Sequence, residues 1–320
     1  MWGSPLGWTI SLVLLAIMVL GLWWIEQAGA ISAPTDLARN SENLRTLSLP
    51  VSPRTVVSMD KPQDAGPIYR RALGAVEEDE ALYRRLFDSP RLYRGERLKA
   101  IDLLIEATLC ADMSLFADRP ERIINYENDP RELQTLEALG RLCNQIGLRD
   151  KEPMNALRYY EAAFSLGAKL FDERLAAPEM MAGMTLMGES AQGIMQAAAG
   201  IADDRRITAA REFEAARRRY YSERIEPLLR VLRSIDPQIV GRHGGDVYHI
   251  AQHAEERLWR IEATLALGRM RYFAGQGGSA GDQRGVLRML ESLQKDPDPM
   301  VRTAAAAAIE LTPQQYRMLR

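Results

Sequence analysis

The sequence predicts an all-α protein: an N-terminal single transmembrane helix, followed by a helical bundle that grades into an α-solenoid-like end. Three observations predict this class. Residues 6–25 carry no charge over a length that spans a bilayer. From residue 63 onward, apolar residues recur at helical spacing in one segment after another. No segment of that region alternates apolar and polar residues as a half-buried strand does.

The apolar run from Leu6 to Ile25 has the length and the flanks of a membrane anchor. A helix of about 20 residues spans about 30 Å, the thickness of the hydrocarbon core. Aromatic residues gather at membrane interfaces, and four of the five tryptophans bound this run: Trp2, Trp8, Trp23 and Trp24. A cleaved signal peptide is the alternative, because Ala28–Ala30 (AGA) resembles a cleavage site. We expect residues 1–25 to be an uncleaved anchor, since signal peptides have a shorter apolar core and a basic start.

The orientation of this anchor is read from the charges beside it. No Lys or Arg precedes the apolar run, whereas Arg39 and Arg45 come after it. The positive-inside rule then favours a cytoplasmic domain, but long domains translocate largely regardless of such charges. Because N-terminal anchors commonly export the domain attached to their C-terminal end, we expect an extracytoplasmic domain and keep the cytoplasmic one as the alternative.

The rest of the chain divides into a linker and two helical parts. Residues 26–62 are rich in Pro, Ser, Thr and Asn, the composition of a linker. Its one extended piece, RTVVSM at 54–59, makes no sheet alone. Residues 63–280 form the main helical domain, and residues 281–320 form the C-terminal helices.

Several segments of the main domain are predicted to be helices. Residues 96–111 have helical apolar spacing, and a helix is expected to begin at Asp129 with Pro130 and Glu132 in its first turn. Residues 153–171 place four apolar side chains on one face: Leu157, Tyr160, Phe164 and Phe171. Residues 178–200 are apolar nearly all round, which predicts a central helix. A long helix over 207–235 should kink near Pro227.

Composition excludes some classes of function. The net charge is −2, so no overall basic field favours nucleic acid. Five of the 41 basic residues are lysine, which we read as a coding bias toward arginine rather than as phosphate chemistry. Cys110 and Cys143 lie in apolar stretches expected to be helical, so two buried free thiols are predicted. A disulfide is the alternative outside the cytoplasm, and the spacing does not suit zinc.

The last residues resemble a HEAT-type repeat. Val286–Gln294 would be its first helix and Asp296–Pro299 its turn, and the second helix carries the family's Val-Arg-x-Ala-Ala pattern as Val301, Arg302, Ala304 and Ala305. The resemblance implies structural roles: the alanines let helices approach, and the arginine ties neighbouring turns.

A second segment resembles a tetratricopeptide hairpin. Leu136, Leu139, Gly140 and Cys143 fit its first helix, and Ala156 and Tyr160 fit its second, although the turn is four residues longer than in that family. The whole chain resembles uncharacterised membrane-anchored bacterial proteins, a resemblance that implies no activity.

All three histidines, His243, His249 and His253, lie in the segment RHGGDVYHIAQH at 242–253. We expect Asp246 to open a helix here, which places His249 and His253 four residues apart on one face. With Glu256 as a third ligand and His243 or Asp246 as a fourth, these residues could bind a metal.

A continuous helix through this segment argues against the metal. The helix would bury two apolar stripes and leave the histidines on a polar strip with Glu256, Arg257, Arg260 and Arg271. Glu256 would pair with Arg260 four residues on, and three guanidiniums would repel a divalent cation. The pattern H-E-x-x-H is also absent, since Ile250 follows His249. We therefore assign no metal ligand, and a metal-dependent enzyme or sensor stays as the alternative.

Other motifs have structural explanations. GESAQG at 188–193 lacks the strand and the spacing of a serine nucleophile elbow. RRRYYSER at 217–224 is interleaved with glutamates that make ion pairs. The methionine-rich stretch is expected to fill the core, with an apolar ligand or lipid as the alternative: Met180, Met181, Met184, Met187 and Met195.

These observations identify no catalytic residue and no cofactor. The sequence therefore favours a non-enzymatic, membrane-anchored helical scaffold that binds another protein and no nucleic acid.

Overall fold

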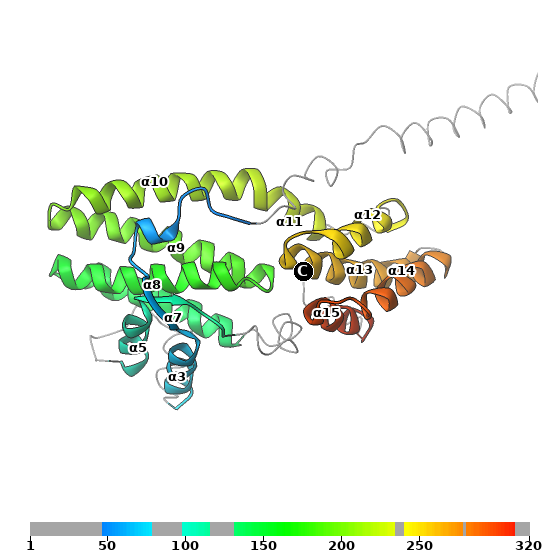
Figure 1. The fold of residues 1–320 in the computed structure, drawn as a ribbon, viewed down its shortest axis with the longest axis horizontal. Helices are drawn as coiled ribbons and strands as arrows, with labels where there is room; N and C mark the ends of the chain where they lie inside the picture. Colours follow the sequence, from blue (N-terminus) through cyan, green and yellow to red (C-terminus); the bar gives the residue numbers. More distant parts are fainter. Residues whose placement is uncertain (1–46, 79–97, 116–130, 234–239, 278–279, 311–320) are drawn as a thin grey trace, which may run out of the picture. The chain divides into compact units, whose positions relative to one another are not determined.

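The computed structural model describes residues 47–78, 98–115, 131–233, 240–277 and 280–310. These residues are mostly helical, which confirms the all-α class apart from one small sheet (Figure 1). All described residues belong to one compact unit, residues 43–320. The predicted anchor at residues 6–25 lies outside them. Within the described ranges, no helix has both the length and the apolarity needed to cross a membrane.

From α7 to α10, and again from α12 to α15, the helices follow one another with short connections. In chain order they are α3 (Gly66–Glu77), α5 (Lys99–Ala107), α7 (Arg131–Arg149), α8 (Pro153–Glu173), α9 (Ala177–Gly200), α10 (Asp204–Tyr220), α11 (Glu226–Arg233), α12 (Val240–His253), α13 (Arg257–Gly277), α14 (Ala280–Leu293) and α15 (Pro299–Glu310).

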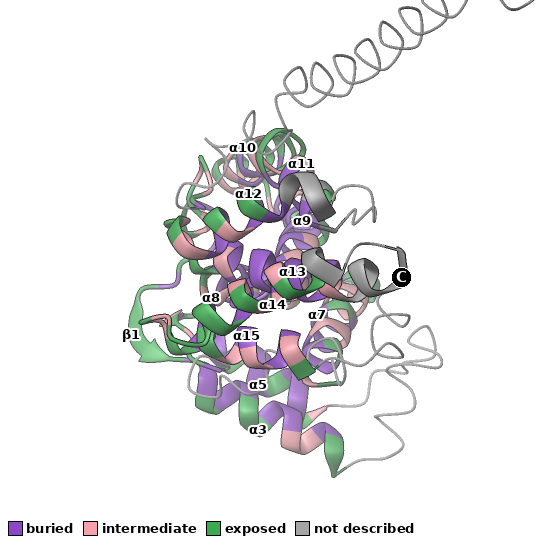
Figure 2. Cartoon of the chain, turned by 90° about the vertical axis from the view of Figure 1, so that its right-hand side faces the viewer, coloured by how far each residue is buried: buried purple, intermediate pink, exposed green. Residues whose placement is uncertain are grey.

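Helices α7 to α10 pack as antiparallel neighbours, with α8 and α9 in the middle of the contacts. The predicted apolar face of α8 is buried, and α9 is buried over most of its circumference, as its all-round apolar sequence predicts (Figure 2). Glycines of α7 let it approach these helices, since Gly140 faces Leu186 and Gly147 faces the Tyr160 ring. Both predicted thiols are buried and free.

The backbones of α8 and α9 meet at two glycines. A Cβ atom added to Gly183 would lie 2.6 Å from the Gly167 carbonyl oxygen, and one added to Gly167 would lie 2.8 Å from the Gly183 carbonyl oxygen. Such distances are shorter than a carbon–oxygen contact allows, so only glycine fits on both sides. The pair sets the distance between the two central helices.

Asp203 closes the turn between α9 and α10 from both sides. The Asp203 N–H donates to the Ala198 carbonyl and the Ala202 N–H to the Ala199 carbonyl, which is the bond pattern of a Schellman C-cap. Ala202 accordingly takes a left-handed conformation with φ 55°. The Asp203 carboxylate then accepts a bond from the Arg206 N–H at 3.1 Å and caps α10.

The kink expected near Pro227 takes the form of a π-helical turn, η4 (Tyr221–Ile225), between α10 and α11. Proline donates no N–H bond, and its ring clashes with the carbonyl four residues earlier. Widening the preceding turn relieves that clash.

The histidine segment departs from the predicted single helix. The helix α12 begins at Val240 rather than at Asp246, and Gly244 and Gly245 lie inside it. It ends at His253, and α13 starts independently at Arg257. The two pack against each other, so the continuous helical wheel over 246–273 was wrong. The helix α13 reaches Gly277, and α14 starts at Ala280.

Residues 47–64, which include part of the predicted linker, form a strap packed on the helical domain. Its apolar residues are buried: Leu47, Val56, Val57 and Met59. The strap (blue in Figure 1) passes α10, which it contacts through the 3₁₀ turn η2 (Pro53–Thr55), and leads toward α3. The RTVVSM piece therefore forms a turn and irregular chain instead of a strand.

The strap ends in a short parallel sheet of β1 (Lys61–Asp64) and β2 (Cys110–Asp112). Every residue of β1 is exposed (green in Figure 2), as an edge strand with a proline tolerates. Cys110 belongs to β2, because α5 stops at Ala107; the helix predicted over 96–111 was too long.

We predict that Gly183→Ala destabilises the fold by about 1–3 kcal/mol, because the added methyl group overlaps the backbone of α8. Gly74→Ala in α3 is the matched control. Its Cβ would meet no atom within 4 Å, so the substitution should stabilise the helix by about 0.5–1 kcal/mol. Denaturant unfolding of both variants measures the difference, and equal effects would contradict the close contact.

Candidate functional site

The histidine cluster assembles no metal site among the described side chains. His249 and His253 are exposed on α12, with ring centroids 4.7 Å apart. Within the described ranges, no group of three His, Cys, Asp or Glu side chains could hold a metal ion. The side chain of His243 lies outside what the structure describes.

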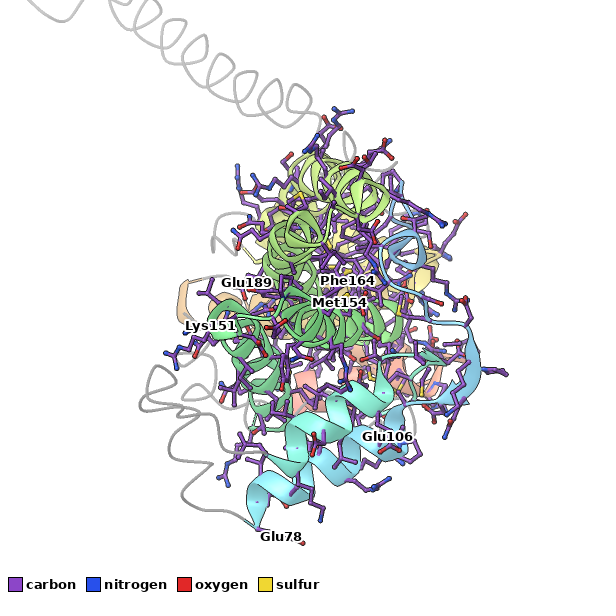
Figure 3. The ribbon with its side chains drawn as sticks, turned by 90° about the vertical axis from the view of Figure 1, so that its left-hand side faces the viewer. Glu78, Glu106, Lys151, Met154, Phe164 and Glu189 are labelled. Atoms are coloured by element: carbon purple, nitrogen blue, oxygen red, sulfur yellow. The ribbon has the colours of Figure 1, made fainter. Side chains whose placement is uncertain are left out.

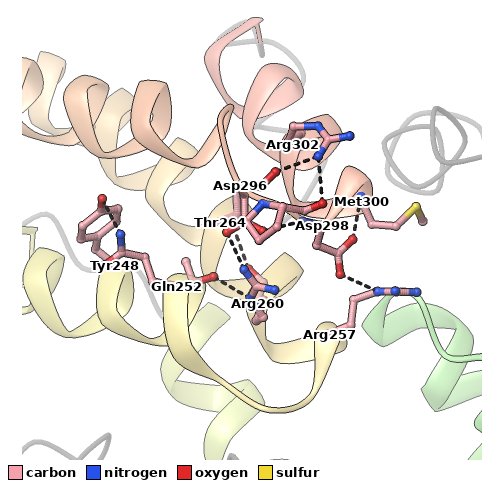
Figure 4. Close-up of polar contacts among 11 residues, drawn as sticks. Tyr248, Gln252, Arg257, Arg260, Thr264, Asp296, Asp298, Met300 and Arg302 are labelled. Carbon is pink, nitrogen blue, oxygen red and sulfur yellow. Dashed lines mark hydrogen bonds and ion pairs between the residues drawn. The ribbon is translucent and has the colours of Figure 1, made fainter.

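The charged residues expected beside the histidines point to other partners. Glu256 pairs with Arg174 at 3.2 Å instead of with Arg260. Arg260 donates to the Ala251 carbonyl at the end of α12 and to Asp296, and Arg257 pairs with Asp298 at 2.8 Å (Figure 4). The charged residues Glu256, Arg257 and Arg260 of the predicted polar strip thus contact neighbouring elements, whereas the two described histidines of that strip are exposed.

The turn Asp296–Pro299 between α14 and α15 is held from two sides. Arg302 donates to the carbonyls of Asp296 and Pro297 in its own turn, at 2.7 and 3.0 Å (Figure 4). The Asp298 carboxylate accepts from the Met300 N–H at 2.9 Å and begins α15. The alanines of α15 expected to face other helices are buried, whereas Arg302 is exposed. Here the arginines of α13, and not Arg302, tie the turn to its neighbour.

Three other motifs are also used structurally. Ser190 of GESAQG donates to Asn144 at 3.0 Å. Arg217 makes two bonds to Glu214 and one to the Met184 carbonyl, and Arg218 pairs with Glu214 as well. Those two guanidiniums are therefore engaged with the protein itself. On the methionine-rich α9, three of the five methionines are fully buried: Met180, Met184 and Met187.

The structure shows a buried polar cluster that sequence patterns did not predict. Lys169 of α8 is 2% exposed and Ser165, one turn earlier, is fully buried. The Lys169 ammonium donates to Ser165 Oγ and to the carbonyls of Ala107 and Thr108, where α5 ends. Ser165 in turn donates to the Thr108 carbonyl at 2.8 Å. The sequence feature that could have revealed this cluster is a lysine inside an apolar helical stretch, with a serine four residues before it.

This Ser–Lys pair is arranged as a helix cap. A serine nucleophile needs a base that accepts its proton, but the Ser165 proton goes to a carbonyl oxygen and Lys169 acts as a donor. The ammonium satisfies the last carbonyls of α5, where the helix dipole favours a cation. Burial lowers the pKa of Lys169 to about 8.

Other titratable groups surround the pair. The Tyr69 hydroxyl lies near Ser165 and both thiols but makes no hydrogen bond of ordinary geometry with a described residue. Burial raises the pKa of Tyr69 and raises that of Cys143 to about 12. With these raised pKa values, Tyr69 and Cys143 are neutral at physiological pH and do not compensate the lysine charge.

Two buried carboxyl groups lie at the start of α9. Glu262 accepts from the Ala177 N–H at 3.0 Å, and Glu179 accepts from the Leu175 N–H at 2.7 Å. The other oxygen of Glu179 has no partner among the described residues, and burial raises the pKa of this carboxyl well above its usual range. The pair satisfies backbone donors at a helix start, and Glu262 links α13 to α9.

The α7–α8 turn exposes large apolar side chains. Leu148, in the last turn of α7, is 70% exposed, and Met154, in the first turn of α8, is 56% exposed. Residues 150–152 connect the two helices. Figure 3 views this part of the bundle and labels Lys151 and Met154. Among the described residues, Leu109 is the other large apolar side chain exposed to a similar degree, at 54%.

Comparisons of the whole chain with protein-family models, with characterised proteins and with solved structures find no match.

We predict that Lys169 makes stability depend on pH. Between its folded pKa of about 8 and the ordinary value of 10.5, the unfolded chain binds more protons than the folded chain. The free energy of unfolding contributed by this group therefore rises with pH over that window, by about 3 kcal/mol at 1.36 kcal/mol per pH unit, and is flat below it. Lys169→Met should remove this rise.

Denaturant unfolding of the wild type and Lys169→Met from pH 7 to 11 measures the effect as the difference between the two curves. Lys151→Met, at an exposed position, is the control and should follow the wild type. A difference between wild type and Lys169→Met that stays constant with pH would show that the lysine is not desolvated.

Proposed function

We propose that the helical domain is a non-enzymatic module that binds another protein, held at a membrane by residues 6–25 with the domain on the extracytoplasmic side. The observation that supports this most is the exposed apolar turn between α7 and α8, where Leu148 and Met154 flank four charged residues, 149–152, and Pro153. The proposal treats this turn as the centre of the binding surface.

The turn is held in shape before any partner arrives. The Glu152 N–H donates to the Asp150 carboxylate at 2.9 Å, which fixes the connection. A Cβ atom on Gly200, at the end of α9, would lie 2.8 Å from the Pro153 ring, so α9 supports the first turn of α8 closely. Pre-organised side chains lose less conformational entropy on binding.

The energetics favour a protein partner with an apolar anchor. Full burial of a Leu or Met side chain stabilises by about 1.5–3 kcal/mol relative to exposure. Two such residues form a small apolar centre, and exposed Lys151 and Glu152 supply a polar rim, as protein interfaces do. The four charged residues of the turn, 149–152, carry two charges of each sign, so the apolar residues supply most of the affinity.

The test uses the full chain in its native membrane, with a photo-crosslinking amino acid at Lys151. We expect one discrete crosslinked protein, lost when Leu148→Glu and Met154→Glu are introduced together because two carboxylates prevent burial of the turn. Identification of the crosslinked band by mass spectrometry is the measurement.

Leu109→Glu is the matched control. This leucine has a similar exposure but lies just after α5, in a different part of the surface. Its neighbour Thr108 contacts Ser165, which is eleven residues from Met154 along α8. Crosslinking that survives the double substitution, or that is lost equally with Leu109→Glu, would contradict the proposal. If the crosslinked product contains only a second copy of the chain, the turn mediates self-association, and the proposal of a different protein partner is wrong.

A further inference from the structure

The Arg174–Glu256 ion pair holds the main chain of a residue distant in sequence. Glu256 Oε2 accepts from the Leu47 N–H at 3.2 Å, and Arg174 Nη2 donates to the Leu47 carbonyl at 2.9 Å. Both polar groups of one peptide residue are thus bound, one by each partner of the pair. The Leu47 side chain is 3% exposed.

The two charged residues are themselves fixed by the helices that carry them. Arg174 follows α8 and donates to the Phe171 carbonyl at 2.8 Å, with its guanidinium 5.0 Å from the Phe171 ring centroid. Glu256 directly precedes α13 and receives two bonds from Arg174. Their side chains are only 12% and 13% exposed, so each needs its partners to offset desolvation.

A further side chain faces the same place. Tyr220, at the end of α10, interacts with the Ser48 main chain, Arg174 and Glu256, and burial raises its pKa. Groups from α8, α10 and α13 therefore converge on two consecutive residues of the strap.

We infer that Arg174, Glu256 and Tyr220 form a binding site for an extended peptide segment that presents one aliphatic side chain and a free main-chain N–H and C=O. The chain supplies that segment itself as Leu47, the first described residue after the region that contains the predicted anchor. The main-chain bonds are independent of sequence, and the buried leucine supplies the selectivity.

An internal segment and an external peptide would compete for this site. A segment on the same chain has an effective concentration in the millimolar range, so it excludes an external peptide of equal affinity. Release of Leu47 would open the site. Arg174 and Glu256, whose ion pair joins the α8–α9 turn to α13, would then lose the main-chain group that both of them bind. This inference is independent of the α7–α8 turn and of its proposed partner.

The experiment adds a synthetic peptide with the sequence of residues 43–60 to the purified full chain. Leu47→Asp should weaken the internal segment because a carboxylate cannot be buried unpaired. We expect the peptide to bind this variant at least tenfold more tightly than it binds the wild type, measured by fluorescence anisotropy of a label on the peptide.

Two controls make the result specific. A peptide that carries aspartate at the position of Leu47 should not bind, and adding Arg174→Met to the Leu47→Asp chain should abolish binding of the original peptide. Leu49→Asp, at a half-buried position in the same segment, should leave the affinity of the chain for the peptide as low as that of the wild type. If Leu47→Asp lowers the helical circular dichroism, Leu47→Ala takes its place.

Equal binding of the peptide to the wild type and to the Leu47 variants would overturn the inference. So would binding that Arg174→Met does not affect. Neither outcome bears on crosslinking at the α7–α8 turn, so the two proposals fail separately.

Discussion

The close approach of α8 and α9 is the constraint on which the rest of the fold depends. Gly167 and Gly183 bring the two backbones to a distance at which no Cβ atom fits between them. This contact buries most of the circumference of α9, and it places α8 against both α7 and α5. The Lys169 cap and the Arg174 pair both lie toward the C-terminal end of α8.

Four cationic side chains bind the C-terminal ends of neighbouring helices. A helix C-terminus leaves carbonyl groups without partners and carries a partial negative charge, so a guanidinium or ammonium from another helix satisfies both needs. Among the described helices, four end in this way: α5 at Lys169, α11 at Arg269, α12 at Arg260 and α15 at Arg271. These three arginines therefore have a structural use that requires no anionic ligand.

Local sequence patterns predict the central helices but not the contacts between distant segments. The burial of Leu157, Tyr160 and Phe164 follows from helical spacing, and the irregular turn before Pro227 follows from the chemistry of proline. The break between α12 and α13 has no glycine or proline to mark it. It occurs where Glu256 turns toward Arg174 and Leu47, a contact that spans more than 200 residues of sequence. Lys169 was missed for the same reason, because its acceptors belong to another helix.

Hydrogen–deuterium exchange of the full chain, followed by mass spectrometry, tests the central role of the α8–α9 contact most directly. Amides in the most tightly packed unit exchange only through the highest-energy openings. The account predicts that the slowest amides lie in α8 and α9 around Gly167 and Gly183, with α3, α5 and α12 to α15 exchanging faster. Slower exchange in α13 to α15 than in α8 and α9 would contradict it.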